Sequence, residues 1–306
     1  MAGWGLIAIR FALYADLLLL VGLSAFPLYS LTRAERKIAW VQQLGILLAW
    51  LAVAGLLFSV IGLAVAAAAM MDVPLTALDV SMLASIVTET ALGTAWSVRL
   101  AALAAVLAGF FILRRSLTAK LALSLAGGSV ALATLLWSGH AGATEGVIGG
   151  AHRISDIAHM VAAGLWLGGI ASFCLLLFSF ADTQDENQVA LVARTLDTFS
   201  LVGTAAVVIV VITGLFNRVA ISGADVPSLV QSSYGLLLTA KVLLVGAMLA
   251  LAANNRWKLT PALGRALYSE DTSTAWRRLR MSVGLEAAGG ATVLILVAWL
   301  GTLSPG

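Results

Sequence analysis

The sequence predicts an all-α, polytopic integral membrane protein, a bundle of about eight transmembrane helices. Of its 306 residues, 61% are hydrophobic and 11% are charged, whereas a typical soluble domain carries about 25% charged residues. Apolar stretches of about 20 residues, enough to cross a bilayer, recur along the whole chain. They are continuous rather than alternating, which excludes the strands of a transmembrane barrel.

Eight apolar stretches are predicted to be the spans, because a backbone inside lipid must satisfy its own hydrogen bonds and therefore becomes helical. They are Leu6–Tyr29, Leu44–Met70, Ala91–Leu113, Leu121–Trp137, Ile157–Phe180, Leu201–Ala220, Tyr234–Ala253 and Val283–Thr302. The first stretch lacks the basic start and the small-residue cleavage site of a signal peptide, so we expect it to be retained. Residues 1–306 are predicted to form a single membrane domain.

The basic residues predict the orientation of these spans. Thirteen of the eighteen Lys and Arg residues fall in alternate connections, after the first, third, fifth and seventh spans. Cytoplasmic loops carry the excess of Lys and Arg, so these connections are assigned to the inside and both termini to the outside. The thirteen are Arg33, Arg36, Lys37, Arg114, Arg115, Lys120, Arg194, Arg256, Lys258, Arg265, Arg277, Arg278 and Arg280.

All three histidines lie in one stretch, SGHAGATEGVIGGAHRISDIAHMVAAGLWLGG, which we assign to the outside connection before span five and to its start. His152 and His159 are seven residues apart, so on a helix they share a face and lie about 10 Å apart along its axis. That separation is too long for one ion to touch both, but it suits two successive binding stations. Asp156 and Met160 flank this face, and His140 at the end of span four is placed to fold back towards either histidine.

These side chains indicate a metal or haem site. Imidazole, carboxylate and thioether groups together suit copper, and the thioether favours Cu(I). Imidazole also suits haem iron as an axial ligand, and the spacing alone does not choose between the two. The alternative without a ligand is that the histidines cap helices. The single cysteine, Cys174, excludes an internal disulfide and a thiolate cluster, and no basic stripe interleaved with aromatic residues indicates nucleic acid.

Several charged residues fall inside predicted spans, where a charge at the bilayer centre costs about 3 kcal/mol on insertion scales. Lys241 lies near the middle of span seven, so we expect a carboxylate partner, with Glu286 and Asp16 as candidates. Such a pair fits either a structural ion pair or a relay for protons or ions. Trp166 lies seven residues after His159 and shares its face, where it would either cover a metal site or pack in the core.

The stretch HRISDIAHMVAAGLWLGG resembles the histidine-containing helix of the bacterial copper resistance protein D (CopD) family. The C-terminal part, residues 190–306, is similar to that family's conserved domain through a series of motifs in order. They are TLDTFS, VVITGLFNRV, SSYGLLLTAKVLLV, LALAANNRWKLTP, RLRMSVGLEAAGG and LGTLSP. The resemblance implies a multi-pass protein of the bacterial inner membrane that moves copper from periplasm to cytoplasm beside a periplasmic copper-binding protein. The outside, to which the charge pattern assigns both termini, is then the periplasm.

The leading hypothesis is therefore a copper-transport or copper-handling membrane protein that is not an enzyme. Copper would arrive at His140 and His152 and pass to His159 and Met160, while the intramembrane Lys and Glu side chains shape the electrostatics of the path. Two alternatives stay open: a haem-binding membrane redox protein that uses the same histidines, and an accessory subunit without its own ligand. The chain contains neither a phosphate-binding GxxxxGK[ST] loop nor a Cys-Pro-Cys element, so it is not predicted to be an ATP-driven pump.

Overall fold

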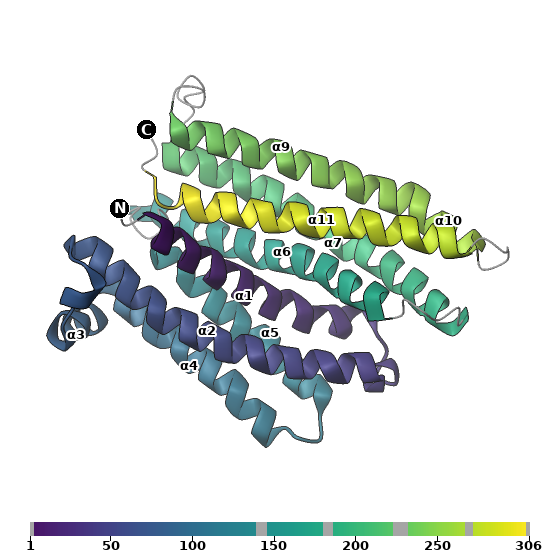
Figure 1. The fold of residues 1–306 in the computed structure, drawn as a ribbon, viewed down its shortest axis with the longest axis horizontal. Helices are drawn as coiled ribbons and strands as arrows, with labels where there is room; N and C mark the ends of the chain where they lie inside the picture. Colours follow the sequence, from purple (N-terminus) through teal and green to yellow (C-terminus); the bar gives the residue numbers. More distant parts are fainter. Residues whose placement is uncertain (1–2, 139–145, 180–185, 223–231, 267–271, 304–306) are drawn as a thin grey trace.

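The protein is an all-helical bundle (Figure 1), seen in a computed structural model that describes residues 3–138, 146–179, 186–222, 232–266 and 272–303. Within these ranges, eight helices are long and apolar enough to cross a membrane, which confirms the predicted fold class. The spans lie on α1 (Gly3–Ser30), α2 (Ala39–Met71), α4 (Ala91–Ile112), α5 (Leu117–Ala133, with η3 extending the span to Trp137), α6 (Gly146–Ser179), α7 (Glu186–Ser222), α9 (Ser233–Asn254) and α11 (Thr272–Leu300).

Shorter elements complete the described chain. They are η1 (Glu35–Lys37), η2 (Leu75–Ala77), α3 (Val80–Glu89), η3 (Thr134–Ser138), η5 (Asn255–Leu259) and α10 (Thr260–Ala266). The segment η5 is a π-helix that joins α9 to α10. Asp79 caps the start of α3 by accepting a hydrogen bond from the Met82 amide at 2.8 Å.

The fifth span begins earlier than predicted, because α6 starts at Gly146 rather than at Ile157. His152 was predicted to lie in a connection, and this was wrong: it lies inside α6 and is only 1% exposed. Polar residues lower the hydropathy of this first part of α6, but they do not break a helix when they face the protein interior.

Helix α1 is central to the bundle. It packs against α2 and α5 on one side and against α6 and α11 on the other (Figure 1). The N-terminal helices α2 to α5 and the C-terminal helices α6 to α11 therefore form two groups joined along α1.

The contact between α1 and α6 is made backbone to backbone by glycines. A Cβ atom on Gly22 of α1 would lie 2.1 Å from the carbonyl oxygen of Gly164 on α6. A Cβ atom on Gly168 would lie 2.3 Å from the Gly22 Cα. Gly164 and Gly168 form a GxxxG pair, the spacing that lets membrane helices approach most closely.

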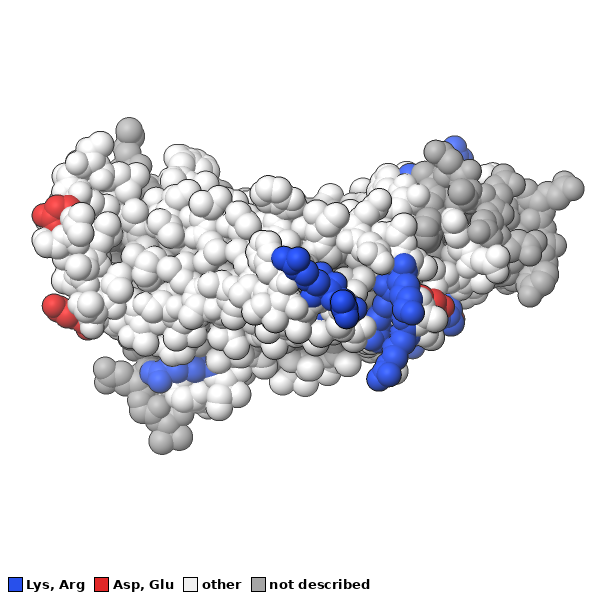
Figure 2. Space-filling view, turned by 90° about the horizontal axis from the view of Figure 1, so that it is seen from below, with Lys and Arg blue, Asp and Glu red and all other residues white. Residues whose placement is uncertain are grey.

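The two ends of the bundle differ in charge. The rings of Trp4 and Trp299 lie 6.0 Å apart, so α1 begins where α11 ends, and α3 lies at this same end, which we call the α3 end (Figure 1). At the opposite end, which we call the basic end, Arg194 of α7 pairs with Glu35 of η1. Figure 2 shows most of the basic side chains of that face towards the basic end and acidic ones at the α3 end.

We predict that Gly168→Ala lowers the stability of the protein by about 1–3 kcal/mol, because the added methyl group forces α1 and α6 apart. Gly150→Ala on the same helix is the matched control, since a Cβ atom there meets nothing within 4 Å. The measurement is the midpoint of thermal unfolding in detergent, followed by circular dichroism. Equal midpoints for the two variants would contradict a tight α1–α6 contact.

Candidate functional site

A cavity of about 250 Å³ lies among α1, α6, α7, α9 and α11 in the half of the bundle nearer the α3 end. We call it the His159 cavity. Six of the predicted site residues line it: His152, Asp156, His159, Met160, Trp166 and Lys241. The structure therefore brings together most of the side chains that the sequence singled out.

Three predicted residues are not part of this cavity. His140 lies outside the described residues. Glu286 lines a second cavity nearer the basic end. Asp16 of α1 is buried against α2 and lines neither cavity. A Cβ atom on Gly55 of α2 would lie 2.6 Å from the Asp16 Oδ2.

The imidazole of His159 is held against α7. Its Nδ1 lies 3.0 Å from the Thr213 Oγ1, and the imidazole also interacts with the Val210 carbonyl. The Thr213 hydroxyl also lies 2.5 Å from the Ile209 carbonyl and 3.3 Å from the Val210 carbonyl. When its proton is donated to either carbonyl, its oxygen accepts from the Nδ1–H of His159, and the Nε2 lone pair of that tautomer can bind a metal.

Asp156 is the carboxylate that shares a cavity with Lys241, although the ion pairs within 4.0 Å in the described chain do not include these two side chains. The charges of Asp156 on α6 and Lys241 on α9 act on each other across the cavity, and Asn217 of α7 donates to the Asp156 Oδ1 at 3.2 Å. We expected Glu286 or Asp16 as the partner of Lys241, and this was wrong. The reason is geometric: Asp156 and Lys241 lie at similar depths on helices that face the same cavity.

Two thioethers share the cavity with His159. Met160 follows the histidine on α6, and Met248 of α9 is 1% exposed. A Cβ atom on Gly289 of α11 would lie 3.2 Å from the Met248 Sδ, so this glycine makes room for the thioether. Sequence reasoning missed Met248, although it lies seven residues after Lys241 and therefore on the same helix face.

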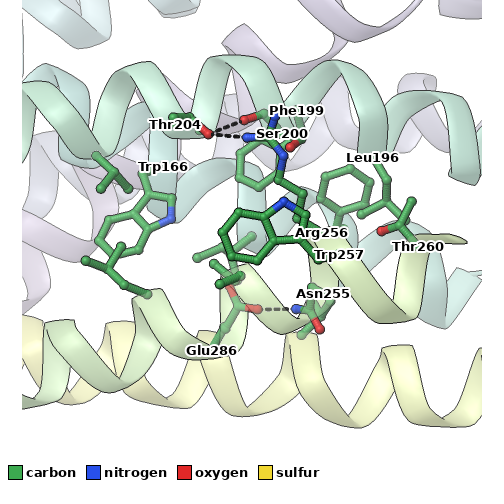
Figure 3. A pocket seen from close by; sticks show the side chains of 18 of the residues that line it. Trp166, Leu196, Phe199, Ser200, Thr204, Asn255, Arg256, Trp257, Thr260 and Glu286 are labelled. Atoms are coloured by element: carbon green, nitrogen blue, oxygen red, sulfur yellow. Dashed lines mark hydrogen bonds between the residues drawn. The ribbon is translucent and has the colours of Figure 1, made fainter.

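The second cavity, of about 260 Å³, lies among α6, α7, α9, η5, α10 and α11 (Figure 3). We call it the Glu286 cavity. The Asn255 amide of η5 donates to the Glu286 carboxylate of α11. On the α7 side, Arg256 donates to the Thr204 hydroxyl at 2.9 Å. Aromatic side chains, among them Trp257, cover much of the remaining wall.

Trp166 is the residue that the two cavities share. Its side chain is 5% exposed and lines both cavities. Within the described chain, α9 makes its main backbone contacts with α11 and η5 rather than with α6 or α7. The two cavities thus follow one another along α9, and the indole of Trp166 lies between them.

The described residues contain no group of three or more His, Cys, Asp or Glu side chains close enough to hold a metal ion together. The candidate ligands that line the His159 cavity are instead the imidazoles of His152 and His159, the thioethers of Met160 and Met248, and the Asp156 carboxylate, which accepts a hydrogen bond from Asn217. Nitrogen and soft sulfur donors of this kind prefer Cu(I) to harder ions.

Comparison with known proteins identifies the family. Residues 1–151 match the copper resistance protein D-like N-terminal domain, and residues 193–300 match the copper resistance protein D family model. The chain is 41% identical over 300 residues to copper resistance protein D of Pseudomonas syringae pv. tomato, covering 98% of this chain and 96% of the relative. The chain belongs to the copper resistance protein D family.

A second relative is more distant in sequence. The chain is 32% identical over 169 residues to the inner membrane protein YebZ of Escherichia coli K12, which covers 55% of this chain and 54% of that protein. No solved structure matches the chain. The resemblance seen in the sequence motifs is confirmed, and a copper-related role in a multi-pass membrane protein follows from the family.

We predict that Asp156→Asn destabilises the protein by about 3 kcal/mol, because it leaves the Lys241 ammonium without its carboxylate. Adding Lys241→Gln should restore much of that loss, since the second change removes the charge that needed a partner. A double-mutant cycle on unfolding free energies in detergent measures the coupling. Additive effects would show that the two side chains do not interact.

We also predict that Trp166 blocks passage between the cavities. In a Cys174→Ser background, Val207→Cys places a thiol in the Glu286 cavity and Val210→Cys places one in the His159 cavity. A small impermeant thiol reagent added at the α3 end should modify the second thiol readily and the first only after Trp166→Ala. Equal modification of both thiols with Trp166 intact would rule out the barrier.

Proposed function

We propose that this protein transports copper across the bacterial inner membrane, from the periplasm towards the cytoplasm, with the His159 cavity as the entry site. One observation carries the proposal. The His159 imidazole, whose Nδ1 lies against Thr213 of α7, lines a cavity together with Met160 and Met248.

The ligand set suits an ion that passes through rather than one that stays. A conducting site must bind its ion strongly enough to admit it and weakly enough to release it. The positive charge of Lys241 lies in the same cavity as Asp156, so it opposes the approach of a copper ion to that carboxylate. This repulsion weakens copper binding and favours release.

The orientation of the proposed transport follows the distribution of charge. The basic end, with the Arg and Lys residues of the α1–α2 and α4–α5 connections, is assigned to the cytoplasm by the positive-inside rule. The α3 end, and with it the mouth of the His159 cavity, then faces the periplasm, where a soluble copper-binding protein would deliver the ion. We infer no enzymatic step.

The haem alternative is less well supported. Axial ligation from two sides needs histidines on facing helices, whereas both described histidines lie on α6. His152 is a full two turns from His159, so a single haem iron between them is excluded by helix geometry.

The test is copper stoichiometry of the detergent-purified protein under reducing conditions, with an absorbance spectrum of the same sample. We expect His159→Ala to abolish high-affinity Cu(I) binding, and Met248→Leu to weaken it by about tenfold or more, since each removes a soft ligand. The matched control is Met281→Leu, whose side chain is 63% exposed on α11 and lines neither cavity.

Unchanged copper binding in a His152→Ala/His159→Ala double variant would eliminate this site. A Soret band in the spectrum of the purified protein would favour the haem alternative instead. Loss of binding in His159→Ala together with retained copper uptake into proteoliposomes would show that transport takes another route.

A further inference from the structure

A groove at the basic end gathers cationic side chains that the proposed copper path does not use. It lies among α2, α4, α5 and the connections that precede α2 and α5, with a volume of about 710 Å³, and we call it the basic groove. Among the described residues, those that line it include six cations and no Asp or Glu. The cations are Arg33, Arg36, Lys37, Arg114, Arg115 and Lys120.

Glu35 lies among these cations in the chain, but its carboxylate is used elsewhere. It accepts hydrogen bonds from the amide and the hydroxyl of Thr32, both at 2.8 Å, and it pairs with Arg194 of α7. Glu35 does not line the basic groove. The positive charges of the groove are therefore not balanced by a carboxylate in its own wall.

Two of the six cations build the wall of the groove. Arg36 donates to the carbonyls of Pro27 and Leu28 near the end of α1, at 2.9 and 2.8 Å. The ammonium of Lys120 on α5 lies 5.5 Å from the centre of the Phe110 ring on α4. These contacts hold the connection before α2 and the start of α5 in place around the groove.

Three further cations are available to a ligand. Arg33, Lys37 and Arg115 are exposed, and within the described chain their side chains make no hydrogen bond or ion pair. The start of α5 opens into the same groove, since Ser116 and Thr118 also line it. A helix start carries partial positive charge and free amides, both of which favour an anion.

The groove changes from polar to apolar along α2. Gln42 and Gln43 line it near the basic end, and Ile46 and Trp50 line it further along the helix. Steps of four residues keep these side chains on one helix face. Ile46 and Trp50 are 63% and 66% exposed, which is favourable in contact with lipid chains. A cationic mouth with an apolar continuation matches a molecule that has an anionic head and a hydrocarbon tail.

We propose that the basic groove binds an anionic phospholipid of the cytoplasmic leaflet. Its phosphate would lie among Arg33, Lys37 and Arg115, and an acyl chain would follow Ile46 and Trp50. Basic pockets between transmembrane helices on the cytoplasmic side suit anionic lipid headgroups, and each cation near the surface adds to the attraction. The groove shares no lining residue with the His159 cavity, so this binding is independent of the proposed copper transport.

The test is native mass spectrometry of the full-length protein in detergent, titrated with phosphatidylglycerol or with phosphatidylcholine, whose headgroup has no net charge. We expect wild type to bind phosphatidylglycerol about tenfold more tightly, and Arg33→Gln/Arg115→Gln to weaken that binding by about tenfold or more. The matched control is Arg277→Gln/Arg278→Gln. It removes two exposed cations of α11 that do not line the groove, and it should leave the affinity unchanged.

Gln43→Lys keeps the proposal testable if the double variant fails to fold. It adds a cation at an exposed position of the groove and should bind phosphatidylglycerol more tightly, a gain that a misfolded protein would not show. Excess inorganic phosphate should not displace the lipid, because it has no chain to occupy the apolar part. Equal affinity for the two lipids, displacement by phosphate, or binding that Arg33→Gln/Arg115→Gln leaves intact overturns the proposal.

Discussion

The arrangement of this bundle depends on one close contact, the glycine crossing of α1 and α6. Because Gly22, Gly164 and Gly168 carry no side chains, the two backbones touch. This contact fixes the position of α6 along the axis of α1. Lipid chains are as apolar as leucine, so the hydrophobic effect gives little preference for one helix position over another inside a membrane. Backbone contact of this kind supplies the positional precision that apolar packing alone does not.

The position of α6 determines the chemistry of the C-terminal half. His159, Met160 and Trp166 all project from this helix, and α7 fixes the histidine ring through Thr213. Helix α9, by contrast, is held mainly by α11 and η5. Helices α6 and α7 thus face α9, which is attached mainly through α11 and η5. Both cavities lie between these two sides.

Much of the fold was predictable from the sequence, because eight apolar stretches and the charge of their connections depend on composition alone. The site was predictable in part. Seven-residue spacing correctly brought His159 and Trp166 to one face, but hydropathy misplaced His152, since its polar neighbours face the protein rather than water. Hydropathy measures how polar a segment is, and it does not say which side of a helix carries the polarity.

Pairings between helices were the part that the sequence did not reveal. The partner of Lys241 was sought among carboxylates in the most apolar segments, whereas Asp156 lies near the start of α6, at a depth that only the packed bundle defines. Thr213 and Met248 are ordinary residues in apolar helices. Their roles follow from the packed bundle, in which Thr213 contacts His159 and Met248 lines the same cavity as that histidine.

The π-helix at η5 has a further consequence for how this chain tolerates change. A π-turn contains one residue more than an α-turn, and each residue of an α-helix advances the side chains by about 100° around the axis. Removing a single residue from η5 would let the chain revert to regular α-helix, and the side chains of the turn itself, Asn255 among them, would take new directions around the axis. Asn255 and Glu286 would then lose their alignment although neither had been mutated. Insertions and deletions in this short segment are therefore as restrictive as substitutions in the cavity itself.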